Sequence, residues 1–183
     1  VIIMQTPVII FHAADERGAS EALLMRAARR YADITGADFS PRSLVRPSFG
    51  KPRFTAEGSP EFSVTHSGGR WLCAFSEQPV GLDIQQRRRV DAERLARRFF
   101  HPEEAALVLA QPDEFFRIWC AKESYVKFTG SGINGDFHRF STVSGRKILG
   151  AINNAELRFV PFSRDCELCL CCSDASLVRF SRL

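Results

Sequence analysis

The sequence has no long uninterrupted hydrophobic run. Its most apolar end, residues 1–11, is broken by Gln5, Thr6 and Pro7 and falls far short of the roughly 20 residues that a membrane-spanning helix needs. The same stretch lacks the basic flank and the small-residue cleavage site of a signal peptide. We therefore expect an opening β-strand there, no attachment to a membrane, and a cytoplasmic protein.

A complete cysteine cluster for a metal is also missing. Cys166, Cys169, Cys171 and Cys172 lie close together and the first two have zinc-like spacing, but no second well-spaced pair and no nearby histidine completes a site. We expect these cysteines to be small buried side chains in a reducing compartment, with a zinc cluster as the less favoured alternative.

The rest of the composition is that of a globular chain. Of its 183 residues, 45% are hydrophobic and 16 are Phe, which is enough core for one domain or for two small fused lobes. The formal net charge is only +4, but residues 85–98 hold six arginines and two acids. Taken alone, this segment is equally consistent with a solvated helix face and with a binding surface for an acidic partner or a polyphosphate.

Hydrophobic periodicity and turn residues predict the elements. We expect a helix over about 16–32 that stops at Gly36, a long loop over 38–61 with one short strand at 44–46, a strand at 62–65, and a hairpin of strands 70–75 and 80–84. A basic helix to about residue 100, a short helix from Glu103 and a long helix over about 113–128 should follow. The last expected strands are 139–143, 147–152, 156–160, 166–172 and 177–180. This order indicates an α+β fold.

Two carboxylates are expected at buried positions. Glu123 and Lys127 are four residues apart on the long predicted helix, one turn beyond Trp119, so an acid and a base share one face. Asp83 lies inside the apolar run 80–84, where an unpaired carboxylate would pay a large desolvation cost. Two buried acids suggest a divalent cation, and an internal salt bridge between Glu123 and Lys127 is the alternative.

Five motifs occur in order along the chain. They are Gly50-Lys51-Pro52, Thr65-His66-Ser67-Gly68, Gly81-Leu82-Asp83-Ile84, Arg98-Phe99-Phe100-His101-Pro102-Glu103-Glu104 and Trp119-x-x-Lys122-Glu123-Ser124-x-x-Lys127. Each is weak alone, but in this order and spacing they resemble the motifs of the surfactin-type (Sfp-type) 4'-phosphopantetheinyl transferases, over about residues 17–140.

The resemblance implies both a fold and a reaction. The fold would be two similar, pseudo-twofold-related α+β lobes, residues 1–84 and 85–183, with the active site in the cleft between them. The reaction would move the phosphopantetheine arm of coenzyme A onto a serine of an apo acyl or peptidyl carrier protein and release 3',5'-ADP. Carrier proteins of this kind are usually acidic, which suits the arginine-rich segment.

The family's functional residues carry over to matching positions. By resemblance, Asp83 and Glu123 would bind Mg²⁺, with Mn²⁺ as the alternative, and Glu123 would help to deprotonate the carrier serine. Lys127 would hold the transferred phosphate, which completes the expected catalytic set. The residues expected to bind coenzyme A are Arg17, Lys51, Pro52, Thr65, His66 and Lys127.

Gln85 departs from the family pattern, because many relatives have a glutamate there. We expect it beside the metal, but an amide oxygen is a poorer Mg²⁺ ligand than a carboxylate and brings no charge. We therefore expect activity with weaker metal affinity. The rival hypothesis is a non-catalytic protein that binds coenzyme A or a carrier protein without transferring anything.

Two other interpretations of the sequence are weak. Residues 130–135 spell G-x-G-x-x-G, but they follow a helix where a dinucleotide-binding loop would join a strand to a helix. The arginine-rich segment has no interleaved stacking aromatics, so we expect no nucleic-acid partner. Because both lobes belong to one chain, a monomer would suffice.

Overall fold

Two four-stranded sheets form the centre of the protein. The computed structural model describes residues 6–48, 50–131, 136–174 and 177–183. The first sheet has the order β12 (Val178–Arg182), β1 (Val8–Ala14), β5 (Arg70–Ser76), β4 (Glu61–Ser67), and the second has the order β6 (Val80–Gln86), β11 (Cys166–Cys172), β10 (Ala155–Phe159), β9 (Ala151–Ile152). Strands β1 and β12 are parallel, and the other pairs in these sheets are antiparallel.

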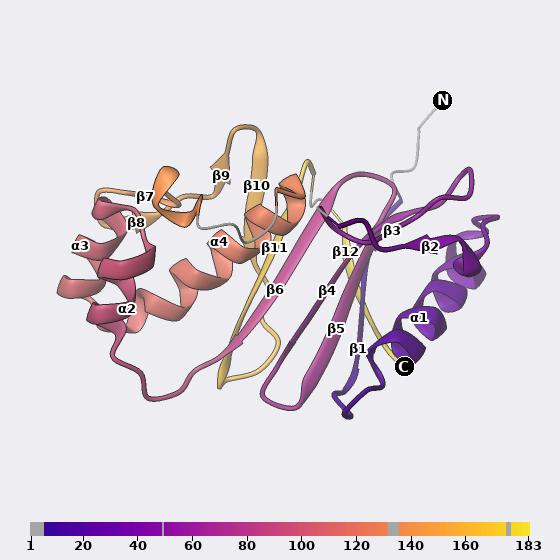
Figure 1. Ribbon diagram of the computed structural model, residues 1–183, viewed down its shortest axis with the longest axis horizontal. Helices are drawn as coiled ribbons and strands as arrows, with labels where there is room; N and C mark the ends of the chain where they lie inside the picture. Colours follow the sequence, from indigo (N-terminus) through magenta and orange to yellow (C-terminus); the bar gives the residue numbers. More distant parts are fainter. Residues whose placement is uncertain (1–5, 49, 132–135, 175–176) are drawn as a thin grey trace.

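Helices α1 (Ser20–Thr35) and α4 (Phe115–Thr129) cover the outer faces of these sheets, and α2 (Ala92–Phe99) and α3 (Pro102–Ala110) lie beyond α4 (Figure 1). Short pairs of strands, β2 (Leu44–Val45) with β3 (Arg53–Phe54) and β7 (Val143–Ser144) with β8 (Lys147–Ile148), lie at the periphery. Turns of 3₁₀ helix occupy Pro41–Ser43, Pro112–Glu114 and Asp136–Arg139.

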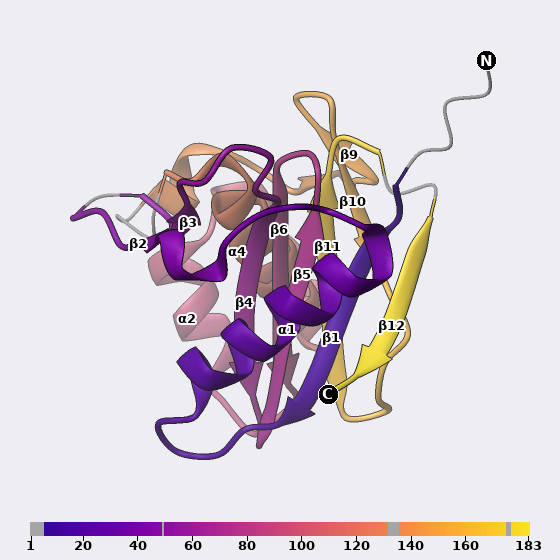
Figure 2. The ribbon, with the colours of Figure 1, turned by 90° about the vertical axis from the view of Figure 1, so that its right-hand side faces the viewer.

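Four hydrophobic clusters join these elements in layers. Helix α1 packs on the outer face of the first sheet around Trp71 and Tyr31, and the inner faces of the two sheets meet around Leu72 and Leu82. On the far side of the second sheet, α4 packs against Cys169 and its neighbours, and α2 and α3 pack against α4 in turn. Figure 2 shows α1 lying across the strands of the first sheet. The order of layers is α1, first sheet, second sheet, α4.

The predicted ends of the helices follow from local chemistry. Gly36 and Gly130 end α1 and α4 in the left-handed conformation, with φ of 73° and 70°, which glycine adopts without steric cost. Helix α3 starts with a capping box, in which Glu104 accepts a hydrogen bond from the His101 backbone N–H at 3.0 Å. Residues 132–135 of the G-x-G-x-x-G stretch lie outside the described residues.

Several predicted elements were wrong in detail. Strands β5 and β6 do not form a hairpin, because β5 pairs with β1 and β4 while β6 pairs with β11. Helix α1 starts at Ser20, not near residue 16, because Gly18 (φ 78°) interrupts the chain before it. The basic helix, for which only an end near residue 100 was predicted, runs from Ala92, where the Asp91 side chain caps it, to Phe99.

Of the five strands predicted after α4, the last three match β10, β11 and β12 to within two residues at each end, and only the first two are shorter than expected. The region 139–143 is the end of a 3₁₀ turn and the start of β7, and 147–152 is divided between β8 and β9. The sheets also do not follow a division at residues 84 and 85. Strand β6, which that boundary cuts, belongs to the second sheet, and β12 from the end of the chain completes the first.

The four clustered cysteines are buried side chains of β11. Cys166 and Cys172 face the first sheet, whereas Cys169 and Cys171 face α4. Because successive side chains of a strand point to opposite faces, the four thiols cannot converge on one ion. Among the described residues, no helix is long and apolar enough to cross a bilayer.

Candidate active site

The site lies along the edge of β6 that faces β4. Three hydroxyl oxygens of β4 accept hydrogen bonds from alternate backbone N–H groups of this edge: Ser63 from Leu82 at 2.9 Å, Thr65 from Ile84 at 3.2 Å and Ser67 from Gln86 at 3.0 Å. These hydroxyls satisfy donors that a neighbouring strand would otherwise bind. The alternating hydroxyls of β4 therefore join the first sheet to the second.

Two lysines use the carbonyl groups of the same edge. Lys51 Nζ donates to the Val80 carbonyl at 3.2 Å, and Lys127 Nζ donates to the Leu82 carbonyl at 3.1 Å. Lys51 also pairs with Glu61 at 2.8 Å. Both predicted phosphate-binding lysines are thus held on one strand, although one comes from the loop before β3 and the other from α4.

Asp83 lies between these contacts and is only 3% exposed. Its Oδ1 accepts hydrogen bonds from Lys127 Nζ at 2.7 Å and from Thr65 Oγ1 at 3.0 Å, and its Oδ2 accepts one from Gln85 Nε2 at 2.8 Å. These three donors compensate the desolvation of the carboxylate.

Glu123 is the second acid, on α4 one turn before Lys127, and it is 7% exposed. Burial, followed by the nearby charge of Asp83, raises the pKa of Glu123 to about 7, and Lys127 and a hydrogen bond from Trp119 oppose this rise. A carboxyl group with this pKa exchanges protons near neutral pH.

Gly81 allows α4 to come this close to β6. A Cβ atom at this position would lie 1.9 Å from the Ser124 carbonyl oxygen and 2.5 Å from the Phe128 backbone nitrogen. No side chain fits between two backbones at such distances. The glycine of the Gly-Leu-Asp-Ile motif therefore brings Glu123 and Lys127 up to Asp83.

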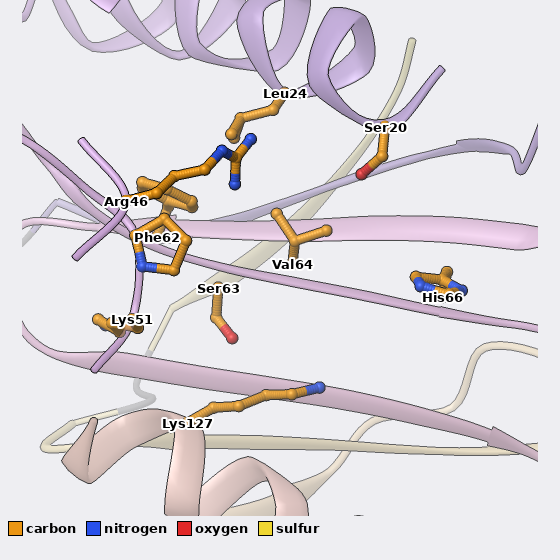
Figure 3. A pocket seen from close by; sticks show the side chains of 10 residues that line it. Ser20, Leu24, Arg46, Lys51, Phe62, Ser63, Val64, His66 and Lys127 are labelled. Atoms are coloured by element: carbon orange, nitrogen blue, oxygen red, sulfur yellow. The ribbon is translucent and has the colours of Figure 1, made fainter. Parts of the chain in front are cut away.

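A cavity of about 320 Å³ lies between α1, β4 and the Lys127 side chain of α4 (Figure 3). Its lining has an apolar part from α1 and β4 and a basic part from three cations and a histidine. The residues are Ser20, Leu24, Arg46, Lys51, Pro52, Phe62, Ser63, Val64, His66 and Lys127. Lys127 lines the cavity and also binds Asp83, so it connects the two parts of the site.

The structure brings most of the predicted residues together. Lys51, Pro52, His66 and Lys127 line the cavity, and His66 also lies 3.5 Å from an Asp15 carboxylate oxygen. Asp83 binds both Lys127 and Gln85, and Glu123 lies one turn before Lys127 on α4. Arg17 is exposed on the turn before α1 and is not among the described residues that line the cavity. Thr65 is 4% exposed and binds Asp83.

Arg46 is a lining residue that the sequence interpretation missed. Its guanidinium points into the cavity between Leu24 and Phe62 (Figure 3), and it pairs with the exposed Glu21 at 3.1 Å. It follows β2 in a loop rich in Pro and Ser, where no motif or periodicity marks it. A basic residue in that loop was the only signal.

The donor set fits a hard divalent cation. Asp83 and Glu123 supply carboxylate oxygens, and burial beside Asp83 disfavours the charged form of Glu123, a cost that a cation would relieve. Among the described residues, no group of three His, Cys, Asp or Glu side chains gathers here or elsewhere. Two carboxylates suit Mg²⁺, which commonly keeps several waters and binds substrate phosphates.

The fold and the site define a class: an α+β protein in which one lysine joins a cation-lined cavity to a buried acidic pair. The model of the 4'-phosphopantetheinyl transferase superfamily matches residues 79–171, just over half of the chain. The chain belongs to this superfamily.

The individual relatives are also named 4'-phosphopantetheinyl transferases. The chain is 37% identical over 99 residues to 4'-phosphopantetheinyl transferase Sfp of Bacillus subtilis, covering 51% of this chain and 43% of that protein. It is 34% identical over 125 residues to another 4'-phosphopantetheinyl transferase of Bacillus subtilis, covering 65% and 54%. With HetI of Nostoc it shares 43% identity over 102 residues, covering 52% and 42%. The chain spans about half the length of these curated relatives.

Proposed function

We propose that this protein is a 4'-phosphopantetheinyl transferase. It transfers the phosphopantetheine arm of coenzyme A to a serine hydroxyl of an apo acyl or peptidyl carrier protein and releases 3',5'-ADP, with Mg²⁺ or Mn²⁺ as the metal. The observation that carries the proposal is Lys127, which lines the cavity and also lies 2.7 Å from Asp83. One cation therefore adjoins both the ligand cavity and the acidic pair.

Coenzyme A suits the cavity because it combines phosphate groups with less polar parts. Lys51 and Lys127 are held by carbonyls two residues apart on β6, which corresponds to roughly 7 Å along a strand. Two ammonium groups on such a spacing can bind neighbouring phosphoryl groups. His66 and Pro52 complete the expected contacts, and Arg17 remains a predicted ligand at the start of α1.

Asp83 and Glu123 would hold the metal, with Gln85 beside them. When bound, the metal neutralises charge that develops on the phosphoryl oxygens. Lys127 then holds the phosphoryl group next to this pair. Positioning and charge neutralisation account for most of the catalysis in such a reaction, because the protein forms no covalent bond to the substrate.

The transfer itself requires one proton acceptor. The serine oxygen forms a bond to the phosphorus next to the pantetheine arm, and the bond from that phosphorus to 3',5'-ADP breaks. The serine proton goes to Glu123, directly or through a water molecule.

The acidic carrier would dock on the basic helix α2. Arg94, Arg97 and Arg98 line a shallow surface hollow of about 560 Å³ together with Asp91 and Glu93. Opposite charges would speed association and orient the carrier serine. The protein would act as a monomer, since the site lies within one chain, and in the cytoplasm, where its six free cysteines stay reduced.

The test is the intact mass of a panel of apo carrier proteins after incubation with the protein, coenzyme A and Mg²⁺. A gain of one phosphopantetheinyl group, absent with a chelator, is the expected result. Glu123→Gln should abolish transfer and leave coenzyme A binding largely unchanged. Wild-type protein that modifies no carrier in the panel would contradict the proposal.

Gln85 favours a second candidate, a protein that binds coenzyme A without transferring its arm. It donates an amide hydrogen to Asp83 at a position where the family resemblance implies an acid. Calorimetry of coenzyme A binding, taken together with the mass assay, separates the two functions. Coenzyme A binding without any mass gain would favour the binding protein, and Gln85→Glu would then be expected to restore transfer.

A further inference from the structure

The three hydroxyls of β4 that face β6 do not play the same part. Ser63, Thr65 and Ser67 each accept a hydrogen bond from a backbone N–H of β6. A hydroxyl has a single hydrogen to donate. What distinguishes these residues is therefore the acceptor that receives that hydrogen.

Thr65 gives its hydrogen to Asp83. Its Oγ1 lies 3.0 Å from Asp83 Oδ1, and this bond is buried. Thr65 is 4% exposed and is not among the residues that line the cavity, whereas its neighbours Val64 and His66 are. A phosphate in the cavity could receive this hydrogen only if the bond to Asp83 were broken and the side chain became accessible.

The bond fixes the carboxylate of Asp83 from the opposite sheet. Gln85 and Lys127, which also donate to this carboxylate, are long side chains with several rotatable bonds. Thr65 has one such torsion, and its oxygen is fixed by the Ile84 N–H at 3.2 Å. Thr65 is therefore more rigid than either of these two donors.

We infer that Thr65 is a positioning residue that orients Asp83 for the divalent cation, and that its hydroxyl does not bind a coenzyme A phosphate. The inference rests on the proposed function, because it concerns the metal of that reaction. It also differs from the role that family resemblance gives this position. Since Thr65 belongs to the first sheet and Asp83 to the second, metal affinity depends on how the two sheets are docked.

Two substitutions and one matched control separate this role from others. Thr65→Val keeps the shape and removes the hydroxyl, and Thr65→Ser keeps the hydroxyl. Ser67→Ala is the control, because it removes an equivalent acceptor for a β6 N–H, that of Gln86 at 3.0 Å, two residues away. Circular dichroism and urea unfolding check that all three variants fold.

Binding is measured directly, without any carrier protein. Free Mn²⁺ is followed by electron paramagnetic resonance, and coenzyme A binding to metal-free protein is followed by calorimetry. Removing a group that orients a metal ligand commonly weakens metal affinity roughly 10–100-fold. We expect this loss for Thr65→Val, near wild-type Mn²⁺ affinity for Thr65→Ser and Ser67→Ala, and an unchanged coenzyme A affinity for all three.

Other outcomes overturn the inference. Wild-type Mn²⁺ affinity in Thr65→Val would do so, as would weakened coenzyme A binding in Thr65→Val with metal affinity intact. An equal loss of Mn²⁺ affinity in Ser67→Ala would show that sheet docking alone is responsible. Wild-type protein that binds Mn²⁺ as expected but modifies no carrier would contradict the proposed function and leave the role of Thr65 in place. Wild-type protein that binds no Mn²⁺ would overturn both.

Discussion

Lys122 and Glu104 form an ion pair that solvent does not reach. Lys122 Nζ lies 2.6 Å from Glu104 Oε2, and both side chains are 0% exposed. The carboxylate also accepts hydrogen bonds from the backbone N–H and the hydroxyl of Thr142, both at 2.7 Å, and Lys122 donates to the Phe140 carbonyl at 2.6 Å. The pair thus joins α3, α4 and the segment before β7. Lys122 directly precedes Glu123 in the sequence.

Removing one partner should destabilise the fold. Glu104→Gln keeps the shape but leaves a buried ammonium group whose pKa burial already lowers. We expect a loss of about 3–5 kcal/mol in the free energy of unfolding, measured by urea denaturation. The control is Glu93→Gln, which breaks the exposed pair with Arg97 and should cost under about 1 kcal/mol. Equal losses in the two variants would contradict the prediction.

Adding one methyl group to Gly81 should separate α4 from β6. Because the backbone of α4 lies 1.9 Å from the place that an alanine Cβ would take, Gly81→Ala forces a backbone shift, and we expect a loss of stability of about 1–3 kcal/mol or more. Mn²⁺ affinity should fall too, since Glu123 and Lys127 move away from Asp83. Gly150→Ala is the control, because nothing lies within 4 Å of its Cβ position. An unchanged Mn²⁺ affinity in Gly81→Ala would show that α4 does not need this contact.

The sequence predicted which residues would meet better than it predicted the strand pairing. Asp83, Glu123 and Lys127 were expected at one site from their motifs and the family resemblance, and Lys127 lies 2.7 Å from Asp83 and one turn after Glu123 on α4. The turn between residues 75 and 80 was also predicted. A turn signal does not tell whether the flanking strands pair, and here they enter different sheets because β6 finds its partner in β11, some 80 residues later. Such long-range pairing has no local signal.

The cavity was less predictable than the acidic pair. Arg46 and Lys51 come from a loop without hydrophobic periodicity, and only Lys51 belongs to a motif. The alternation Ser63, Thr65, Ser67 was a readable pattern, because residues two apart in a strand share a face. It shows that the inner face of β4 is polar. The pattern does not show that this face meets the edge of β6, because that contact depends on the order of the strands in the two sheets.

The metal-free protein should lose stability as the pH rises from 4.5 to about 7. The pKa of Glu123 is about 7 in the folded state, against an ordinary glutamate pKa of 4.5, so between these values the folded state binds more protons than the unfolded state. Stability therefore falls with rising pH over that window. Urea unfolding in chelator at pH 5 and pH 8 should show a smaller pH effect in Glu123→Gln than in wild type. Identical pH effects would mean that Glu123 titrates normally.

Reversing one charge on α2 should slow carrier modification without disturbing the site. Arg94 is exposed on α2, so Arg94→Glu should reduce the rate at low carrier concentration, and the reduction should shrink as salt is added, because salt screens exposed charges beyond about 10 Å at 0.1 M. Arg179→Glu, the same change at an exposed position of β12 in the first sheet, is the control. Coenzyme A affinity should be unchanged in both variants, which separates docking from substrate binding. If the two variants modify the carrier equally slowly, the net charge of the protein and not a surface on α2 guides the carrier. A wild-type rate that does not change with salt would exclude electrostatic docking altogether.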